Sequence, residues 1–113
     1  MLKKANNSLI NFLGEKMNEN EYNQYCNGCK LIFDHYGEEN QLNKLIEECS
    51  ELIRAISRKD KVNILEEVAD VQVLIDQLSI AYPEFDDCIE QTKFNKVERQ
   101  IERITNEQRR NLR

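Results

Sequence analysis

The fold is decided by residues 61–81, which read KVNILEEVADVQVLIDQLSIA. Asp60 stands directly before them, and its carboxylate can accept hydrogen bonds from the free N–H groups at a helix start. Apolar side chains then fall on almost every side of a helix through this stretch, and such a helix lies at the centre of a fold. We therefore predict a buried central helix over residues 61–81. Pro83 either stops it or opens the next helix.

The segments on both sides carry the same helical spacing. Residues 41–58 place apolar side chains at steps of three and four, and similar patterns predict helices over residues 5–17, 21–36 and 84–108, with Gly37 as the stop after 21–36. Only 3 Gly and 1 Pro in 113 residues leave too few turn residues for an all-β fold. The prediction is an all-α protein, folded as a compact bundle of four to five helices.

A chain of 113 residues has room for one compact domain. We divide it into an N-terminal helical extension over residues 1–20, a main domain over residues 21–108 and a frayed C-terminal tail over residues 109–113. No apolar run approaches the roughly 18 residues of a membrane span, and the N-terminus lacks a signal-peptide core. The expected location is the cytoplasm, away from membranes, with all cysteines reduced.

The charge is unevenly distributed along the chain. The whole sequence carries −5, but residues 93–113 alone carry +4, which leaves −9 on the first 92 residues. An acidic body argues against binding to a nucleic-acid polymer. The basic segment would instead help the acidic body to hold a polyanion that binds through a metal.

Two pairs of acidic residues interrupt the two central helices. Glu48 and Glu51 lie three residues apart in the first of them, and Glu67 and Asp70 have the same spacing in the second. Residues at that spacing share one helix face. If the two helices form an antiparallel hairpin across the short connection between them, the four carboxylates can converge.

Four converging carboxylates repel one another, so a positive ion must offset their charge. Oxygen ligands without histidine or thiolate select Mg²⁺, with Mn²⁺ as a substitute, and Mg²⁺ commonly binds substrate phosphates at the same time. This pattern predicts a metal-dependent site for a phosphorylated ligand. The alternative for each pair is an ordinary solvated helix face, which an acidic sequence also produces.

The sequence around these acids resembles a known family. Residues 41–52, QLNKLIEECSEL, and residues 64–71, ILEEVADV, are similar to the E-E-x-x-E…E-x-x-D signature of the MazG-like, all-α nucleoside triphosphate pyrophosphohydrolases. The preceding residues 36–41, YGEENQ, are typical of small phage or bacterial members. The resemblance extends over residues 30–80 and, more loosely, over the last helix, and it implies that the main domain is catalytic.

The resemblance implies a role for each acidic residue. Glu48, Glu51, Glu67 and Asp70 would bind Mg²⁺, and Glu47 would support them. The implied reaction is attack of a metal-activated water on a nucleoside triphosphate, which gives the monophosphate and pyrophosphate. One carboxylate among Glu47, Glu48 and Glu51 would accept the proton of the water.

The basic segment supplies candidates for contact with the substrate. Lys93, Lys96 and Arg99 offer charge-assisted donors for phosphate, with a solvated helix face as the alternative. Members of the family work as homodimers or homotetramers with sites near subunit interfaces, and the resemblance implies the same for this chain. The implied role is the removal of unwanted nucleotides from the cellular pool.

Two other hypotheses remain open. The first hypothesis keeps the same fold and assigns the chain as a phosphoribosyl-ATP pyrophosphohydrolase. In a different class, it would be a non-enzymatic helical interaction or regulatory protein whose acids face solvent.

Cys26 and Cys29 form a C-x-x-C pair, but structural zinc needs four ligands and a redox pair needs a βαβ setting. We interpret these two residues as buried thiols on a helix.

Overall fold

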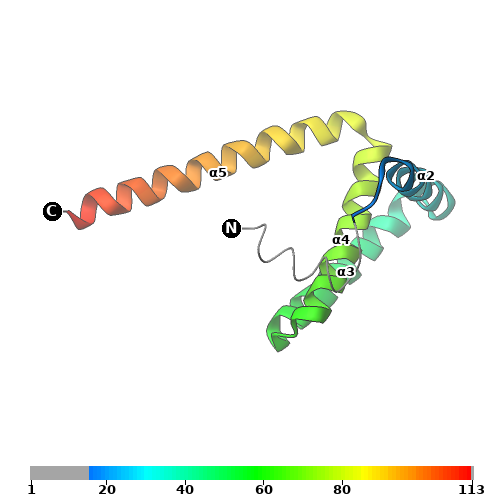
Figure 1. Ribbon diagram of the computed structural model, residues 1–113, viewed down its shortest axis with the longest axis horizontal. Coiled ribbons are helices and arrows are strands. Elements are labelled where there is room, and N and C mark those ends of the chain that lie inside the picture. Colours follow the sequence, from blue (N-terminus) through cyan, green and yellow to red (C-terminus); the bar gives the residue numbers. More distant parts are fainter. Residues whose placement is uncertain (1–15, 113) are drawn as a thin grey trace.

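The computed structural model describes residues 16–112, and its regular elements there are all α-helices (Figure 1). They are α2 (Glu19–Tyr36), α3 (Glu38–Arg58), α4 (Lys61–Ala81) and α5 (Pro83–Asn111). The all-α fold class is therefore confirmed. The helix predicted over residues 5–17 falls almost entirely outside the described residues, as does most of the predicted extension.

A single residue separates α2 from α3. Gly37 takes a φ of 87°, a left-handed conformation that glycine adopts at little steric cost, and its N–H donates to the carbonyl of Phe33. Because one residue completes the turn, α3 begins at Glu38 instead of near residue 41, where the apolar pattern starts. The stop predicted at Gly37 is thus confirmed, and the start of the next helix is corrected by three residues.

The connection between α3 and α4 turns the chain back on itself, so the two helices form an antiparallel hairpin (Figure 1). Lys59 takes a left-handed φ of 57° in this turn. The N-cap predicted at Asp60 is confirmed, since its carboxylate accepts a hydrogen bond from Asn63 N at 3.3 Å. Pro83 stands in the first turn of α5, where its missing N–H is not needed.

The central position predicted for α4 is confirmed, because α2, α3 and α5 all contact it. A hydrogen bond of 2.7 Å from the Tyr25 hydroxyl to Asp76 joins α2 to α4. A second, of 2.8 Å from Gln41 Nε2 to Gln77 Oε1, joins α3 to α4. Burial and the bond to Asp76 raise the pKa of Tyr25, so the hydroxyl keeps its proton and remains a donor. These bonds fix α2 and α3 in register against α4.

The long helix α5 leaves the end of α4 and runs away from the other three helices (Figure 1). Among the described residues it contacts α4 alone. The Cα radius of gyration is accordingly 17.9 Å, whereas a compact domain of about 100 residues has about 13 Å. The compactness expected from the sequence therefore applies to α2, α3 and α4, and not to α5 within one chain.

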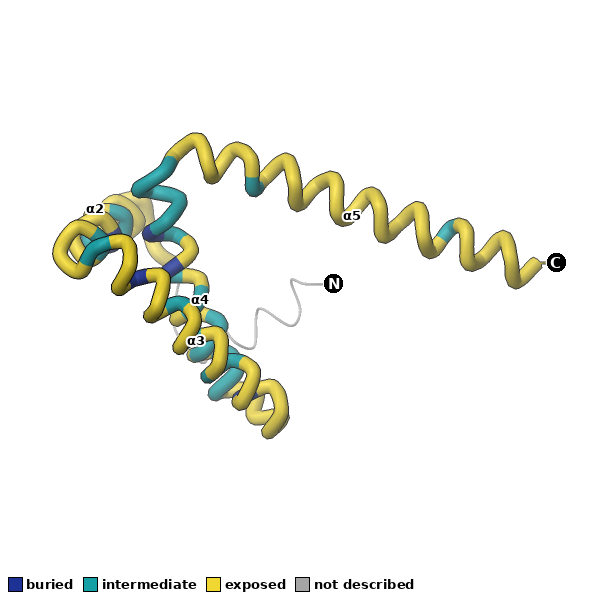
Figure 2. Tube along the Cα trace, turned by 180° about the vertical axis from the view of Figure 1, so that it is seen from behind, coloured by how far each residue is buried: buried dark blue, intermediate teal, exposed yellow. Residues whose placement is uncertain are grey.

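Few of the described residues are buried (Figure 2). They are Cys29, Gln41, Ala55, Leu74 and Gln77. The sequence predicts a buried α4, yet only Leu74 and Gln77 of this helix are buried. The prediction is corrected on this point: most other apolar side chains of α4 stay half-buried because α5 does not fold over them.

The cysteines are free thiols, and the C-x-x-C pair lies within α2 with Cys29 buried and Cys26 half-buried. Burial raises the pKa of the Cys29 thiol, which favours the neutral form. None of the described helices has an apolar stretch long enough to cross a bilayer.

Candidate functional site

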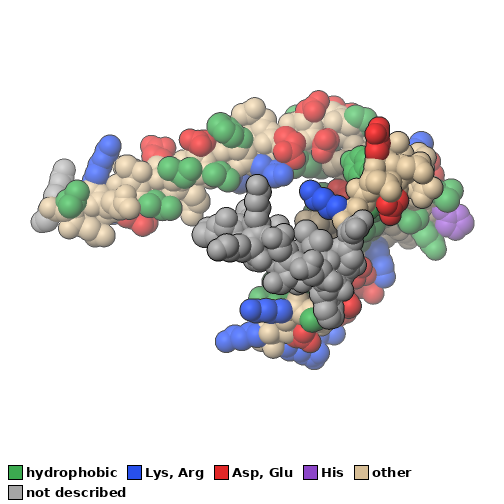
Figure 3. Space-filling view, in the orientation of Figure 1, with side chains coloured by type: hydrophobic (Ala, Val, Ile, Leu, Met, Phe, Trp, Pro, Cys, Tyr) green, Lys and Arg blue, Asp and Glu red, His purple; other side chains and the backbone are tan. Residues whose placement is uncertain are grey.

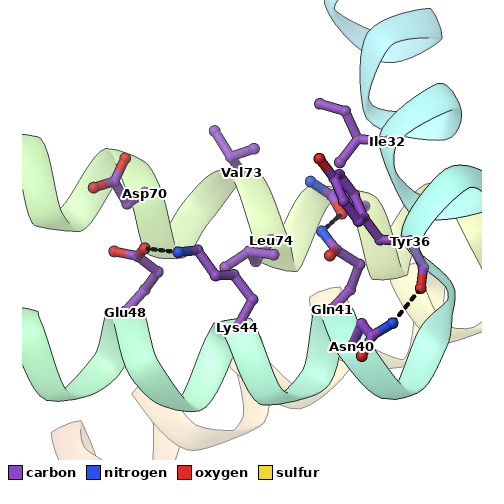
Figure 4. Close-up of a pocket in the computed structure, with 10 residues that line it drawn as sticks. Ile32, Tyr36, Asn40, Gln41, Lys44, Glu48, Asp70, Val73 and Leu74 are labelled. Atoms are coloured by element: carbon purple, nitrogen blue, oxygen red, sulfur yellow. Dashed lines mark hydrogen bonds and ion pairs between the residues drawn. The ribbon is translucent and has the colours of Figure 1, made fainter.

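Acidic side chains from α3 and α4 meet along the hairpin. Glu48 comes from α3, whereas Glu67 and Asp70 come from α4, and one carboxylate oxygen of each lies within 4.8 Å of the others. Figure 4 shows Glu48 and Asp70 facing each other across the two helices. The predicted convergence is thus present for three of the four carboxylates, which we call the carboxylate cluster.

Glu67 shows how unfavourable the cluster is without a positive charge. Its Oε2 atom is buried and lacks a hydrogen-bond partner among the described residues. Loss of solvent raises the pKa of Glu67, and the negative charges of Asp70, Glu48 and Glu51 raise it further. A carboxylate in such surroundings is stabilised by a nearby cation. The residues present therefore fit a hard divalent metal ion.

This account predicts an effect on stability. We expect Glu67→Gln to raise the melting temperature (Tm) of the protein in EDTA by roughly 2–5 °C, because it removes a repelling charge and supplies an amide donor. Glu66→Gln, at an exposed position on the same helix, should change Tm much less. Thermal unfolding measures both. In saturating Mg²⁺ the order should reverse, since only the parent keeps the full ligand set. A lower Tm for Glu67→Gln in EDTA would contradict this account.

The other two predicted acids lie beside the cluster. Glu51 is half-buried, but its Oε2 atom lies 3.5 Å from Nη1 of Arg54, and it is not part of the carboxylate cluster. Glu47 is exposed, with its Oε2 atom 3.7 Å from Nζ of Lys44. Because solvent-exposed ion pairs contribute little free energy, neither acid is held firmly where it lies.

The carboxylate cluster opens into a cleft of about 530 Å³ between α2, α3 and α4. Glu48 and Asp70 line its acidic end. Tyr36, Gln41 and Gln77 line the other end, and apolar side chains of α4 form the wall between the two ends (Figure 4). A volume of this size, with apolar walls and a few polar groups, is typical of sites for small organic molecules.

Lys44 is the one cation among the described residues that line this cleft. Its Nζ atom lies 3.3 Å from Oε1 of Glu48 (Figure 4). The bond to Glu48 and the negative charge of Glu47 raise the pKa of Lys44, so the ammonium group stays charged. A positive charge therefore lies where an anion that binds at the carboxylate cluster would extend into the cleft.

The predicted phosphate contacts lie elsewhere in the chain. Lys93, Lys96 and Arg99 are exposed on α5, and none of them lines the cleft. Lys93 Nζ instead lies 3.1 Å from Glu90 Oε1 on the same helix. Within one chain these three residues form a solvated helix face, and their role toward phosphate stays a prediction.

Sequence reasoning did not select Lys44, Gln41 or Gln77 as site residues. For Gln77 the available signal was a polar side chain inside a nearly all-apolar helix. For the other two residues the signal was their spacing from Glu48. Lys44 lies one turn before Glu48 and Gln41 lies two turns before it, so all three share one face of α3. These signals identify a face but not what lies opposite it.

Comparison with known proteins adds a family match. Residues 36–106 match the family model described as the MazG nucleotide pyrophosphohydrolase domain. The matched range contains the whole carboxylate cluster and most of the residues that line the cleft. No curated protein and no solved structure matches the chain.

Proposed function

Because the chain belongs to the MazG nucleotide pyrophosphohydrolase domain family, we propose that it hydrolyses a (d)NTP to the (d)NMP and pyrophosphate with Mg²⁺. The observation that carries this proposal is the meeting of three carboxylates within 4.8 Å at one end of a cleft large enough for a nucleotide. The biological role we propose is the removal of unwanted nucleotides from the cytoplasmic pool.

Glu48, Glu67 and Asp70 would hold the ion, with Glu51 as the fourth ligand and Mn²⁺ as a substitute metal. The weak ion pair of Glu51 with Arg54, at 3.5 Å, leaves Glu51 free to turn toward the cluster. When bound, the metal orients and neutralises the phosphates and lowers the pKa of a water molecule. The acidic end of the cleft would then bind the phosphates, and its apolar wall would exclude bulk water from them.

One carboxylate among Glu47, Glu48 and Glu51 accepts the proton of the attacking water in this proposal. Glu47 is the most exposed of the three, with 64% of its side chain accessible, against 14% for Glu48 and 40% for Glu51. Exposure lets Glu47 pass a proton on to solvent, whereas proximity to the cluster favours Glu48 and Glu51. The three remain candidates.

We propose that Lys44 leaves its ion pair with Glu48 when substrate binds and pairs with a substrate phosphate instead. The Lys44→Met variant should therefore bind Mg²⁺ more tightly, by about two- to fivefold, because an ion pair within one helix that competes with the metal is worth ~0.5–1 kcal/mol. The same variant should show a KM for nucleotide raised by about tenfold, because a charge-assisted hydrogen bond to phosphate is lost. Calorimetric titration with Mg²⁺ and steady-state kinetics measure the two effects.

The matched control is Lys30→Met. Lys30 forms an ion pair of the same i,i+4 type, 3.1 Å from Asp34, and does not line this cleft. It should leave both the metal affinity and KM unchanged. If Lys44→Met weakened metal and nucleotide binding together, or moved neither of them, Lys44 would have only a structural role.

A second copy of the chain is proposed to cover α5. Phe94, Val97, Ile101 and Ile104 recur at steps of three and four along this helix, and each is more than half exposed. Figure 3 shows apolar side chains on the surface of α5, with charged groups around them. Such spacing is typical of helices that pair with another helix. A homodimer or homotetramer would bury this stripe, which we call the α5 stripe.

The oligomer also gives the basic segment a way to reach the substrate. Lys93, Lys96 and Arg99 do not line the cleft of their own chain, so we propose that they contact phosphate in the site of a neighbouring copy. They lie on the same helix as the α5 stripe, and an interface built on that stripe would carry them toward another subunit.

The direct test of the proposed function is the product formed from a panel of NTPs and dNTPs in Mg²⁺. We expect pyrophosphate and a monophosphate, and no diphosphate or inorganic phosphate as first products. Turnover of phosphoribosyl-ATP alone would assign the chain to the other activity of this fold. The absence of turnover, with no effect of Mg²⁺ on Tm, would favour a non-enzymatic interaction protein.

A further inference from the structure

Two of the five buried residues in the described chain are glutamines from different helices. Gln41 on α3 is 8% exposed and Gln77 on α4 is 3% exposed. An amide loses hydration when it is buried, and this costs free energy unless its polar atoms find partners. Apolar side chains of the same length would fill these positions without that cost. A chain with so few buried residues thus keeps two amides at its centre.

The two glutamine side chains share one hydrogen bond, which uses only part of the hydrogen-bonding capacity of each amide. Gln41 Nε2 donates to Gln77 Oε1 at 2.8 Å. This bond leaves the Gln41 carbonyl oxygen as an acceptor and the Gln77 amide group as a donor, since each amide has both functions. The structure gives these atoms no hydrogen bond to another residue within 16–112, and they are not buried atoms without a partner, so both are open to solvent. The pair therefore offers one acceptor beside one donor.

The pair lines the end of the cleft that lies away from the carboxylate cluster. Gln41 precedes Glu48 by seven residues, which places the pair about 10 Å along α3 from the cluster. This span is comparable with the length of a nucleotide from its phosphates to its base. Tyr36, which is 56% exposed, lines the same end of the cleft and offers a ring face (Figure 4).

We propose that Gln41 and Gln77 form the subsite that reads the nucleobase, by hydrogen bonding to its pairing edge beside Tyr36. The proposal rests on the proposed function, because it assumes that the phosphates occupy the acidic end. The pairing edge of each nucleobase has hydrogen-bond donors and acceptors at adjacent positions, and proteins read an unpaired base by hydrogen bonds to that edge. A base that displaces solvent from these two groups without hydrogen bonding to both is rejected, so the pair sets which base is preferred.

The test uses the double variant Gln41→Met/Gln77→Met. Removing both partners together leaves no orphaned amide, so the variant should fold with a Tm close to that of the parent. The ratio of kcat/KM between the best and the worst base should fall by about tenfold or more. Affinity for inorganic tripolyphosphate, measured by calorimetry with Ca²⁺, should stay within about twofold because that ligand has no base.

The control is Tyr25→Phe. It removes the hydrogen bond of 2.7 Å from Tyr25 on α2 to Asp76 on α4, and neither residue lines the cleft. It should leave the base ratio unchanged. If the double variant kept the parent ratio, or lost activity equally with every base, the glutamines would be structural only. A parent protein without any base preference would also overturn the proposal.

A second measurement needs no variant and no turnover. Binding of a nucleoside monophosphate to the parent is compared with binding of its analogue methylated on the pairing edge, and we expect a loss of about tenfold or more. Equal binding of the two overturns the base subsite. Selective binding without pyrophosphate release upholds the subsite and refutes the proposed hydrolysis, so the two failures are distinguishable.

Discussion

Asp70→Asn is expected to lose more than about 10²-fold in pyrophosphate release while keeping the helical fold. The substitution keeps the shape of the side chain but removes one of the charges that would hold the metal, and even residues that only support metal ligands contribute 10–100-fold. Without metal, Tm should stay equal or rise, because a repelling charge is lost from the carboxylate cluster. Product assays and circular dichroism measure these effects.

The control for this variant is Asp87→Asn, which changes an exposed carboxylate on α5, away from the cleft. It should retain the activity of the parent. Addition of Mg²⁺ should raise Tm of the parent and of Asp87→Asn, but much less for Asp70→Asn. Turnover of Asp70→Asn at the parental rate would show that Asp70 is not a ligand, and the site would have to be reassigned.

The second large effect is expected from a charge in the α5 stripe. Ile101→Glu places a carboxylate in the proposed interface between copies, and burying it there is too costly for the oligomer to persist. Light scattering should then report a monomer of 13.4 kDa. Activity should fall by about 10²-fold, because the monomer loses the charge-assisted phosphate contacts of the neighbouring copy.

Asn106→Glu is the matched control, since it adds the same charge to an exposed position on another face of α5. It should leave the oligomer intact. An active monomer of Ile101→Glu would separate the site from the interface and would leave Lys93, Lys96 and Arg99 without a role in catalysis. A parent that is already monomeric would refute the interface itself.

Local sequence signals predicted the helices well because each depends on residues a few positions apart. The apolar pattern, Asp60 and Gly37 were enough to place the helices, but α2 and α3 begin two and three residues earlier than predicted, and α5 continues through 109–111, which were predicted to fray. The same patterns could not predict that α5 leaves the other helices. The sequence pattern of an apolar helix face is the same whether that face packs within its own chain or against another chain.

The meeting of the acidic side chains could be predicted only in part, for a related reason. The i,i+3 spacing places Glu48 and Glu51 on one face of α3, and Glu67 and Asp70 on one face of α4. Which of the four side chains meet depends on the rotation of one helix against the other. In the structure that rotation brings Glu67 and Asp70 to Glu48, and it leaves Glu51 beside Arg54.

The sequence by itself therefore determined the all-α class, the helix ends and the acidic faces of α3 and α4, since those features arise from neighbours along the chain. Only the tertiary structure decided that Gln41 meets Gln77, 36 residues away, and that Lys44 lies in the same cleft as Asp70. Contacts between distant segments depend on how whole helices pack, and the local spacing of residues does not specify that packing.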